Sequence, residues 1–211
     1  MANDYTTSTD AFADISEGSY SSSDYPQMAS FVTVASRLID AHFARHPGFF
    51  SPSSDDETRY YDGSADIEQP IGEWAEITSV AMSQDGGISS SDYTALTANT
   101  DYFTKPYNRG ANSERPINTL VLNPINDGAF AAWYPYRKAI KIVGRPGYCT
   151  TVPDLVAQAA KVQSIRWFMA SKQGYSEVGA DARAGGLTFV KPTKLDSVVL
   201  DILWPLYLEL S

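Results

Sequence analysis

The hydrophobic period changes twice along this chain, and this constrains the fold more than any other feature of the sequence. Apolar residues recur every three or four positions over residues 26–46, which predicts an amphipathic helix. Between about residues 58 and 148 the apolar runs become short and are separated by turn residues, which predicts antiparallel strands. Helical spacing returns over residues 153–173 and 195–206. The pattern predicts an α+β fold, in which a helical bundle carries an inserted antiparallel β region.

Prolines and glycines mark the expected ends of these elements. Pro26 suits the first turn of the first helix, and Pro47-Gly48 should end it. Pro153 and Asp154 suit the start of the next helix, since an acid there faces the positive helix end. Pro205 is expected to break the last helix. Within the β region, residues 144–147 (Gly-Arg-Pro-Gly) predict a tight turn, and residues 89–99 and 108–116 predict long loops.

Three segments differ in character along the chain. Residues 1–24 are mostly Ser, Thr, Asp, Ala and Tyr, and we interpret them as a flexible arm, mobile or ordered only against a neighbour. Residues 25–194 should form the main domain of helix, β insert and helix. Residues 195–211 form an amphipathic helix followed by an apolar tail.

The overall composition excludes several classes of protein. The net charge of −9 disfavours sequence-wide binding to nucleic acid, because an acidic protein gains nothing from counterion release. Cys149 is the single cysteine, so an intrachain disulfide is impossible. No apolar run approaches the roughly 18 residues of a spanning helix, and no signal peptide is visible at the start, so we expect a soluble protein without a membrane partner.

Few residues carry the pattern of a catalytic or metal site. His42 and His46 have the spacing of a metal pair, but the general-base glutamate of the His-Glu-x-x-His motif is missing. Cys149 has no histidine beside it and is better explained as a small core residue. The acids in residues 55–57 and Asp62 lie among Ser and Gly, with no apolar pocket evident to raise a pKa. We therefore predict no enzyme, and no catalytic, cofactor-binding or metal-binding residues.

The last apolar segment is the sharpest candidate for a functional site. An apolar tail rarely stays in water unaided, so it should either fold back on its own core or dock on a partner, and the sequence leaves both open. Aromatic residues in such tails are frequent interface anchors. The candidate interface residues are Leu203, Trp204, Leu206, Tyr207, Leu208 and Leu210.

Several segments, taken in order, are similar to those of the head-tail connector (adaptor) proteins of tailed bacteriophages. Each piece is short, and it is their succession over about residues 28–175 that carries the resemblance. The long loops, the arm and the aromatic tail depart from the usual form of the family. The matching pieces are the helix ending near Arg45, Thr58–Gly63, Glu76–Val80, Asp101–Pro106, Pro116–Leu122, Ile140–Gly144, Gly147-Tyr148, Val152-Pro153 and the helix containing Gln158–Ala160.

The resemblance implies a structural virion protein with no cofactor, assembled in the host cytoplasm and located in the neck. It implies a dodecameric ring below the portal protein, which extends the DNA channel and presents a platform for the next neck or tail protein. Genomic double-stranded DNA would pass through without sequence-specific binding. Family members often dock a C-terminal helical segment on the portal, a role that falls here on residues 195–210.

Three other functions stay open at this point. A head-closure or tail-completion protein would act one layer lower in the neck and bind the tail tube. A hydrolase would use acidic loop residues such as Asp62. A host-side binding module built from a sheet and helices is the third.

Overall fold

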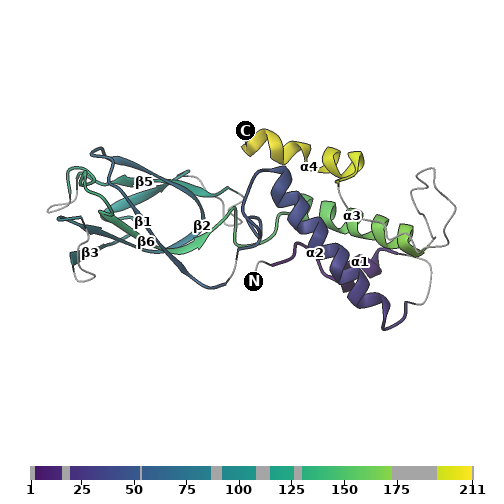
Figure 1. Ribbon diagram of the computed structural model, residues 1–211. Helices are drawn as coiled ribbons and strands as arrows, with labels where there is room; N and C mark the ends of the chain where they lie inside the picture. Colours follow the sequence, from purple (N-terminus) through teal and green to yellow (C-terminus); the bar gives the residue numbers. More distant parts are fainter. Residues whose placement is uncertain are drawn as a thin grey trace. The chain divides into compact units, whose positions relative to one another are not determined.

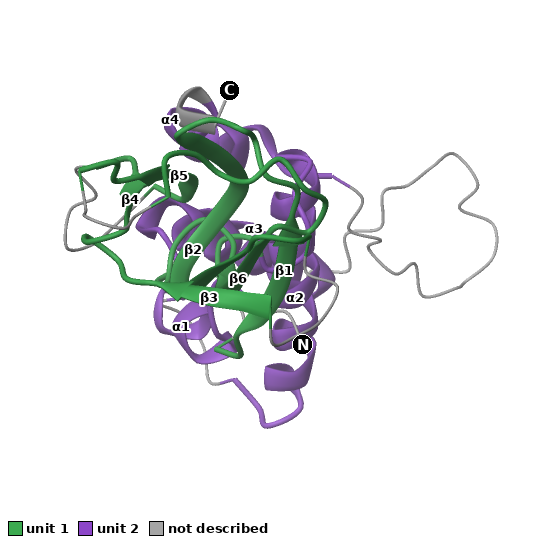
Figure 2. Cartoon of the chain, turned by 90° about the vertical axis from the view of Figure 1, so that its left-hand side faces the viewer, with its two compact units in different colours: residues 1, 49–151 green, residues 2–48, 152–211 purple. Residues whose placement is uncertain are grey.

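The computed structural model describes residues 3–15, 20–52, 54–86, 92–107, 115–125, 130–172 and 194–210; the side chains of 208–210 are not described. The chain divides into two compact units (Figure 2). Unit 1 contains residues 49–151 and is built of strands, whereas unit 2 contains residues 2–48 and 152–211 and is built of helices. The predicted α+β fold, with a β region inserted between helices, is confirmed.

Unit 1 is an antiparallel sheet of six strands (Figure 1). The order across the sheet is β1-β6-β2-β5-β4, and β3 pairs with β2 beside this path. Each strand is a short run of β-favouring residues bounded by turn residues, as the sequence predicts. The strands are β1 (Glu57–Tyr61), β2 (Glu68–Ser83), β3 (Tyr93–Leu96), β4 (Tyr102–Lys105), β5 (Ile117–Leu122) and β6 (Ile140–Pro146).

Strand β2 organises unit 1 because it pairs with three others. Its first part lies against β5, with Gln69 opposite Leu120, and its second part lies against β6, with Val80 opposite Ile142. The register shifts between Pro70 and Trp74, and Gly72 there has a φ of +76°, a value that favours glycine. These irregularities let one long strand take part in both pairings.

The core of unit 1 is a cluster of buried side chains from these strands, together with Trp133 and Ala139. Two tryptophans lie fully buried in it, and their indole N–H groups are satisfied locally. Trp74 Nε1 donates to the Ile71 carbonyl at 3.1 Å, and Trp133 Nε1 donates to the Ile67 carbonyl at 2.9 Å. The buried members are Ile71, Trp74, Val80, Met82, Leu96, Tyr102, Ile117, Leu120, Leu122, Trp133, Ala139, Ile140 and Ile142.

Unit 2 consists of α1 (Ser8–Ala13), α2 (Asp24–His42), α3 (Asp154–Lys172) and α4 (Ser197–Leu210). Helix α2 packs against α3, α3 packs against α4, and α1 contacts both α2 and α3. The buried face of α2 has the predicted spacing, with Met28, Val32, Ala35 and Ile39 all inside.

The first long helix ends earlier than predicted, at His42 instead of residue 46. Ala44 adopts a φ of +53°, its N–H donates to the Ala41 carbonyl, and the Arg45 N–H donates to the Asp40 carbonyl. This is the Schellman arrangement, which normally places glycine where Ala44 stands. Because no glycine stands at this position, the sequence predicts a later stop, at Pro47-Gly48.

Three further predictions of local structure are corrected. Helix α4 continues past Pro205 to Leu210, and burial of Leu206 beyond the proline holds this turn in place. Residues 144–146 belong to strand β6 and do not form a turn; a Cβ on Gly144 would lie 2.3 Å from the Glu76 carbonyl oxygen, so glycine lets the strands approach. The predicted loop at 89–99 contains strand β3, while residues 108–114 of the other loop lie outside the described residues.

The described part of the predicted arm is structured within unit 2. Residues 8–13 form α1, and the side chains of Tyr5 and Phe12 are buried. The boundary at residue 24 separates a flexible arm from the main domain, and the boundary at residue 194 separates the main domain from a docking segment. Both boundaries stay predictions.

Candidate functional site

Helix α4 is fastened to unit 2 along one side. Val199, Leu203 and Leu206 follow one another at spacings of four and three, and all three are buried. The start of the helix is also fixed, because the Asp196 N–H donates to Gln163 Oε1 on α3 at 2.8 Å. Arg166, also on α3, donates to the Asp196 carboxylate at 3.0 Å. The buried stripe and these polar contacts define which side of α4 faces inward.

Three apolar residues of α4 outside this stripe are exposed. Val198, Trp204 and Tyr207, which we call the outer α4 face, have 43%, 60% and 44% of their surface accessible. The polar residues Ser197 and Asp201 lie between Val198 and the two aromatic residues around the helix. A helix this rich in apolar residues is normally buried on all sides, so the exposed pair Trp204 and Tyr207 is a candidate interaction site.

The aromatic residues of this face are held in a fixed arrangement. The rings of Trp204 and Tyr207 are stacked, with centroids 5.9 Å apart and an interplanar angle of 14°. Tyr207 in turn lies 6.3 Å from the rings of both His42 and Phe43 at the end of α2. Ordered aromatic side chains lose little conformational entropy on binding, so this arrangement is well suited to anchor a partner.

The structure separates the residues of the predicted C-terminal interface into three groups. Leu203 and Leu206 are buried and stabilise the helix within unit 2. Trp204 and Tyr207 are exposed on the outer α4 face. Leu208 and Leu210 lie outside the described side chains. The segment thus both folds back on its own unit and leaves a face for a partner, the two alternatives that the sequence left open.

The histidines and the cysteine are not brought together in a reactive group. His42 ends α2, whereas His46 lies beyond the Schellman turn with its Nδ1 at 3.3 Å from the Pro47 carbonyl oxygen. Cys149 is buried and its thiol donates to the Thr151 carbonyl at 2.7 Å. Among the described residues, no group of three His, Cys, Asp or Glu side chains could hold a metal ion.

The acidic loop residues have structural partners. Asp62 Oδ1 accepts a hydrogen bond from the Lys138 N–H at 2.8 Å, and Glu57 accepts one from Arg59 Nε at 2.9 Å. The first contact joins the turn after β1 to Lys138, and the second lies within β1.

Two buried carboxylates in unit 2 were missed by the sequence reasoning. Asp40 lies on α2 and interacts with Tyr5, Gly48 and Arg37. Asp24, at the start of α2, accepts a hydrogen bond from Lys172, which lowers the pKa of its carboxyl group, and a further one from the Ser21 N–H does the same. No local pattern distinguishes these two aspartates from exposed ones.

Comparisons with known proteins find a likeness among solved structures. No protein-family description matches the sequence, and no curated protein matches it significantly. A solved chain from the "neck of empty GTA particle computed with C6 symmetry" is similar at 14% sequence identity and a TM-score of 0.48, covering 96% of this chain and 94% of that one. Within the described part of the chain, no helix is long and apolar enough to cross a membrane. The function therefore has to be inferred from the residues themselves.

Proposed function

We propose that this chain is a non-enzymatic structural protein of the neck of a tailed phage-like particle, a head-tail connector that joins the portal to the tail. In this role it assembles into a ring, which we take to be dodecameric, and extends the DNA channel. Helix α4 docks on the portal, and another surface receives the next neck or tail protein.

The order of the connector-like segments supports this proposal. Seven of them fall in turn on α2, β1, β2, β4, β5, β6 and α3, and the other two, Gly147-Tyr148 and Val152-Pro153, lie between β6 and α3. The helical bundle with an inserted β region that the resemblance implies is the fold of this chain. Agreement between local sequence and global arrangement over so many elements favours a common architecture.

The outer α4 face is the observation that carries the docking role. Its three exposed apolar residues stand on a helix whose other side is already fixed to α3. Partner helices commonly present such a face to an apolar groove, and exposed tryptophan and tyrosine residues supply much of the binding energy in protein interfaces. A groove on the portal is the partner we assign to it.

The charge of the chain fits passage of DNA. At a net charge of −9 the protein repels a phosphate backbone, and an acidic lumen would let genomic DNA slide without sticking. Ring formation needs two different complementary surfaces on each subunit, which the sheet and the helices can supply.

A truncation after Lys194 tests the docking role. Circular dichroism should show that the shortened protein keeps the strands of unit 1, while its binding to the purified portal is lost. The matched control is the full chain with Asp201→Asn, an exposed change on α4 that leaves the three apolar residues in place. Normal portal binding by the truncated protein would contradict the proposal, and binding to the tail tube instead would favour a head-closure or tail-completion protein.

A further inference from the structure

The segment Asn3–Ile15, here called the arm segment, is held on unit 2 in the manner of a bound peptide. Two aromatic anchors are buried: Tyr5 precedes α1, and Phe12 lies within this helix, which Thr7 caps. In the described part of the chain, α1 contacts α2 and α3, and the arm segment takes part in no strand pairing. Bound peptides that place a short helix in a groove between helices are held by anchors of this kind.

The first anchor site surrounds Tyr5. Its hydroxyl donates to Asp40 Oδ1, while the Gly48 N–H donates to Asp40 Oδ2 at 3.0 Å. Tyr5 N–H donates to Ser36 Oγ at 3.0 Å, and the guanidinium of Arg37 lies 5.5 Å from the Tyr5 ring centroid. Asp40 has 2% of its surface accessible, so its carboxylate depends on these partners.

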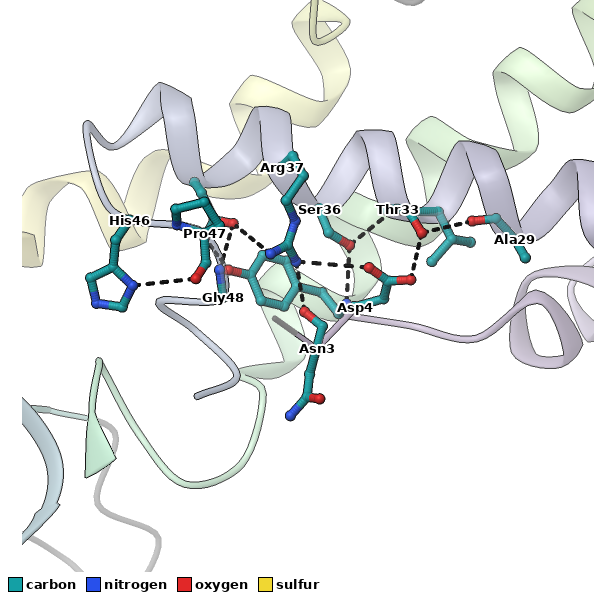
Figure 3. A network of polar contacts seen from close by, with 12 residues as sticks. Asn3, Asp4, Ala29, Thr33, Ser36, Arg37, His46, Pro47 and Gly48 are labelled. Atoms are coloured by element: carbon teal, nitrogen blue, oxygen red, sulfur yellow. Dashed lines mark hydrogen bonds and ion pairs between the residues drawn. The ribbon is translucent and has the colours of Figure 1, made fainter. Parts of the chain in front are cut away.

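Polar contacts fix the residues before Tyr5. Arg37 Nη2 donates to the Asn3 carbonyl at 2.6 Å and forms an ion pair with Asp4 at 3.8 Å (Figure 3). Thr33 Oγ1 donates to Asp4 Oδ2 at 2.7 Å. Side chains of α2 therefore bind residues 3–5 through contacts to both the backbone and the side chains of these residues.

The second anchor site receives Phe12. The centroids of Tyr20, Tyr25 and Phe168 lie 4.4, 4.8 and 5.1 Å from that of Phe12, and Met28 belongs to the same cluster. Asp14, two residues further on, pairs with Lys161 of α3 at 3.0 Å. Without the arm segment, the groove would expose these rings to water and leave the buried Asp40 carboxylate without its tyrosine partner. Both changes are unfavourable, so the groove needs an occupant.

We propose that, in the assembled protein, this groove is occupied by the arm segment of a second copy of the chain. Each copy carries one arm segment and one groove, two different surfaces that complement each other, and contacts of that kind close a ring. Exchange between copies preserves every contact described above, and this makes it a low-cost route to association. The inference rests on the proposed ring and adds the contact that links neighbouring subunits.

Photo-crosslinking of mixed copies tests the exchange. The full chain is made with p-benzoylphenylalanine in place of Phe12, so that an aromatic ring still fills the cage. Equal amounts of nitrogen-15-labelled and unlabelled chains are mixed before assembly. The mixture is then assembled, either without other proteins or in the presence of the portal, and the product is irradiated. In the ring, about half of the crosslinked peptide pairs from the arm and α3 should combine one labelled and one unlabelled partner.

The isotope pattern separates the possible failures. Rings whose crosslinked pairs all carry one isotope would overturn the exchange while leaving the ring intact. A chain that stays monomeric with and without the portal would overturn the exchange and the ring together. As a second measurement on unmodified chains, deletion of residues 1–15 should weaken assembly at least about tenfold, because it removes the segment that would link neighbouring copies; unaltered assembly would overturn the exchange. The exposed arm change Ala13→Ser should leave assembly unaltered.

Discussion

The two units of this chain differ in where they place their apolar residues. In unit 1 the tryptophans Trp74 and Trp133 are fully buried, and several of the exposed aromatic residues are tyrosines in or near turns. In unit 2 the helix α4 buries one apolar side and exposes another that contains Trp204. Single exposed apolar residues are normal, whereas Trp204 and Tyr207 are stacked on one helix. Unit 1 thus keeps its tryptophans inside, and unit 2 exposes one in the surface for which we propose a partner.

A substitution in the core of unit 1 should have the largest effect on stability. Trp74→Ala removes a fully buried indole together with its hydrogen bonds to Ile71 and Tyr61. We expect a loss of about 3–5 kcal/mol in the free energy of unfolding. Urea denaturation followed by far-ultraviolet circular dichroism measures this free energy. A loss below about 1 kcal/mol, which is typical of surface substitutions, would contradict the burial of Trp74 in the core.

The inward side of α4 should behave in the same way on a slightly smaller scale. Leu203 has 1% of its surface accessible, so Leu203→Ala should cost about 2–5 kcal/mol of stability. Hydrogen exchange of α4 amides is the most direct readout, since the helix should open before α2 and α3 do. Unchanged protection in α4 would mean that this side does not fasten the helix.

The adjacent residue provides the contrast that defines the outer face. Trp204→Ala should change stability by no more than about 0.5 kcal/mol, because the side chain is mostly exposed. Portal binding should weaken by about 2 kcal/mol, roughly 30-fold, measured by surface plasmon resonance. If Trp204→Ala instead unfolds α4 and leaves binding unchanged, the inward and outward sides have been assigned the wrong way round.

The smallest effect should come from the ion pair that joins the ends of α2 and α3. Lys172 lowers the pKa of Asp24 from its ordinary value of 3.8, so the folded protein holds this carboxylate ionised more strongly than the unfolded chain does. The resulting stabilisation is present above the ordinary pKa and is lost as the pH falls through the lowered one.

Asp24→Asn should therefore lower the Tm at neutral pH and remove part of the fall in Tm below the ordinary pKa of 3.8. Lys172→Gln should flatten the same part of the curve, because it removes the partner. Calorimetric scans across this range check both variants. A curve for Asp24→Asn parallel to that of the original chain would show that this pair does not contribute.

The elements with strong periodicity could be predicted, and those that depend on distant contacts could not. The apolar stripe of α2 and the strands β5 and β6 are visible in the sequence because each follows one clear period. Strand β3 is short and exists by pairing with β2, and α1 has too few residues to show a period. Ala44 adopts a left-handed conformation at the end of α2, for which glycine is the usual signal in a sequence.

The docking role of the last segment stays a prediction, and the structure adds which of its side chains face inward. The sequence shows that α4 is apolar, but a helix that is apolar nearly all round gives no sign of which side faces inward, so Leu203 and Trp204 could not be distinguished. The peptide-like groove was beyond prediction for another reason. Tyr5 and Asp40 are 35 residues apart, and only the fold brings them into contact.

The central claim is that this protein works as a ring-forming connector, and its mass in solution tests that most directly. Native mass spectrometry or light scattering would be carried out on the full chain, alone and mixed with its cognate portal. The account predicts a ring, or a stoichiometric complex with the portal that appears on mixing. A monomer that ignores the portal under all of these conditions would contradict it.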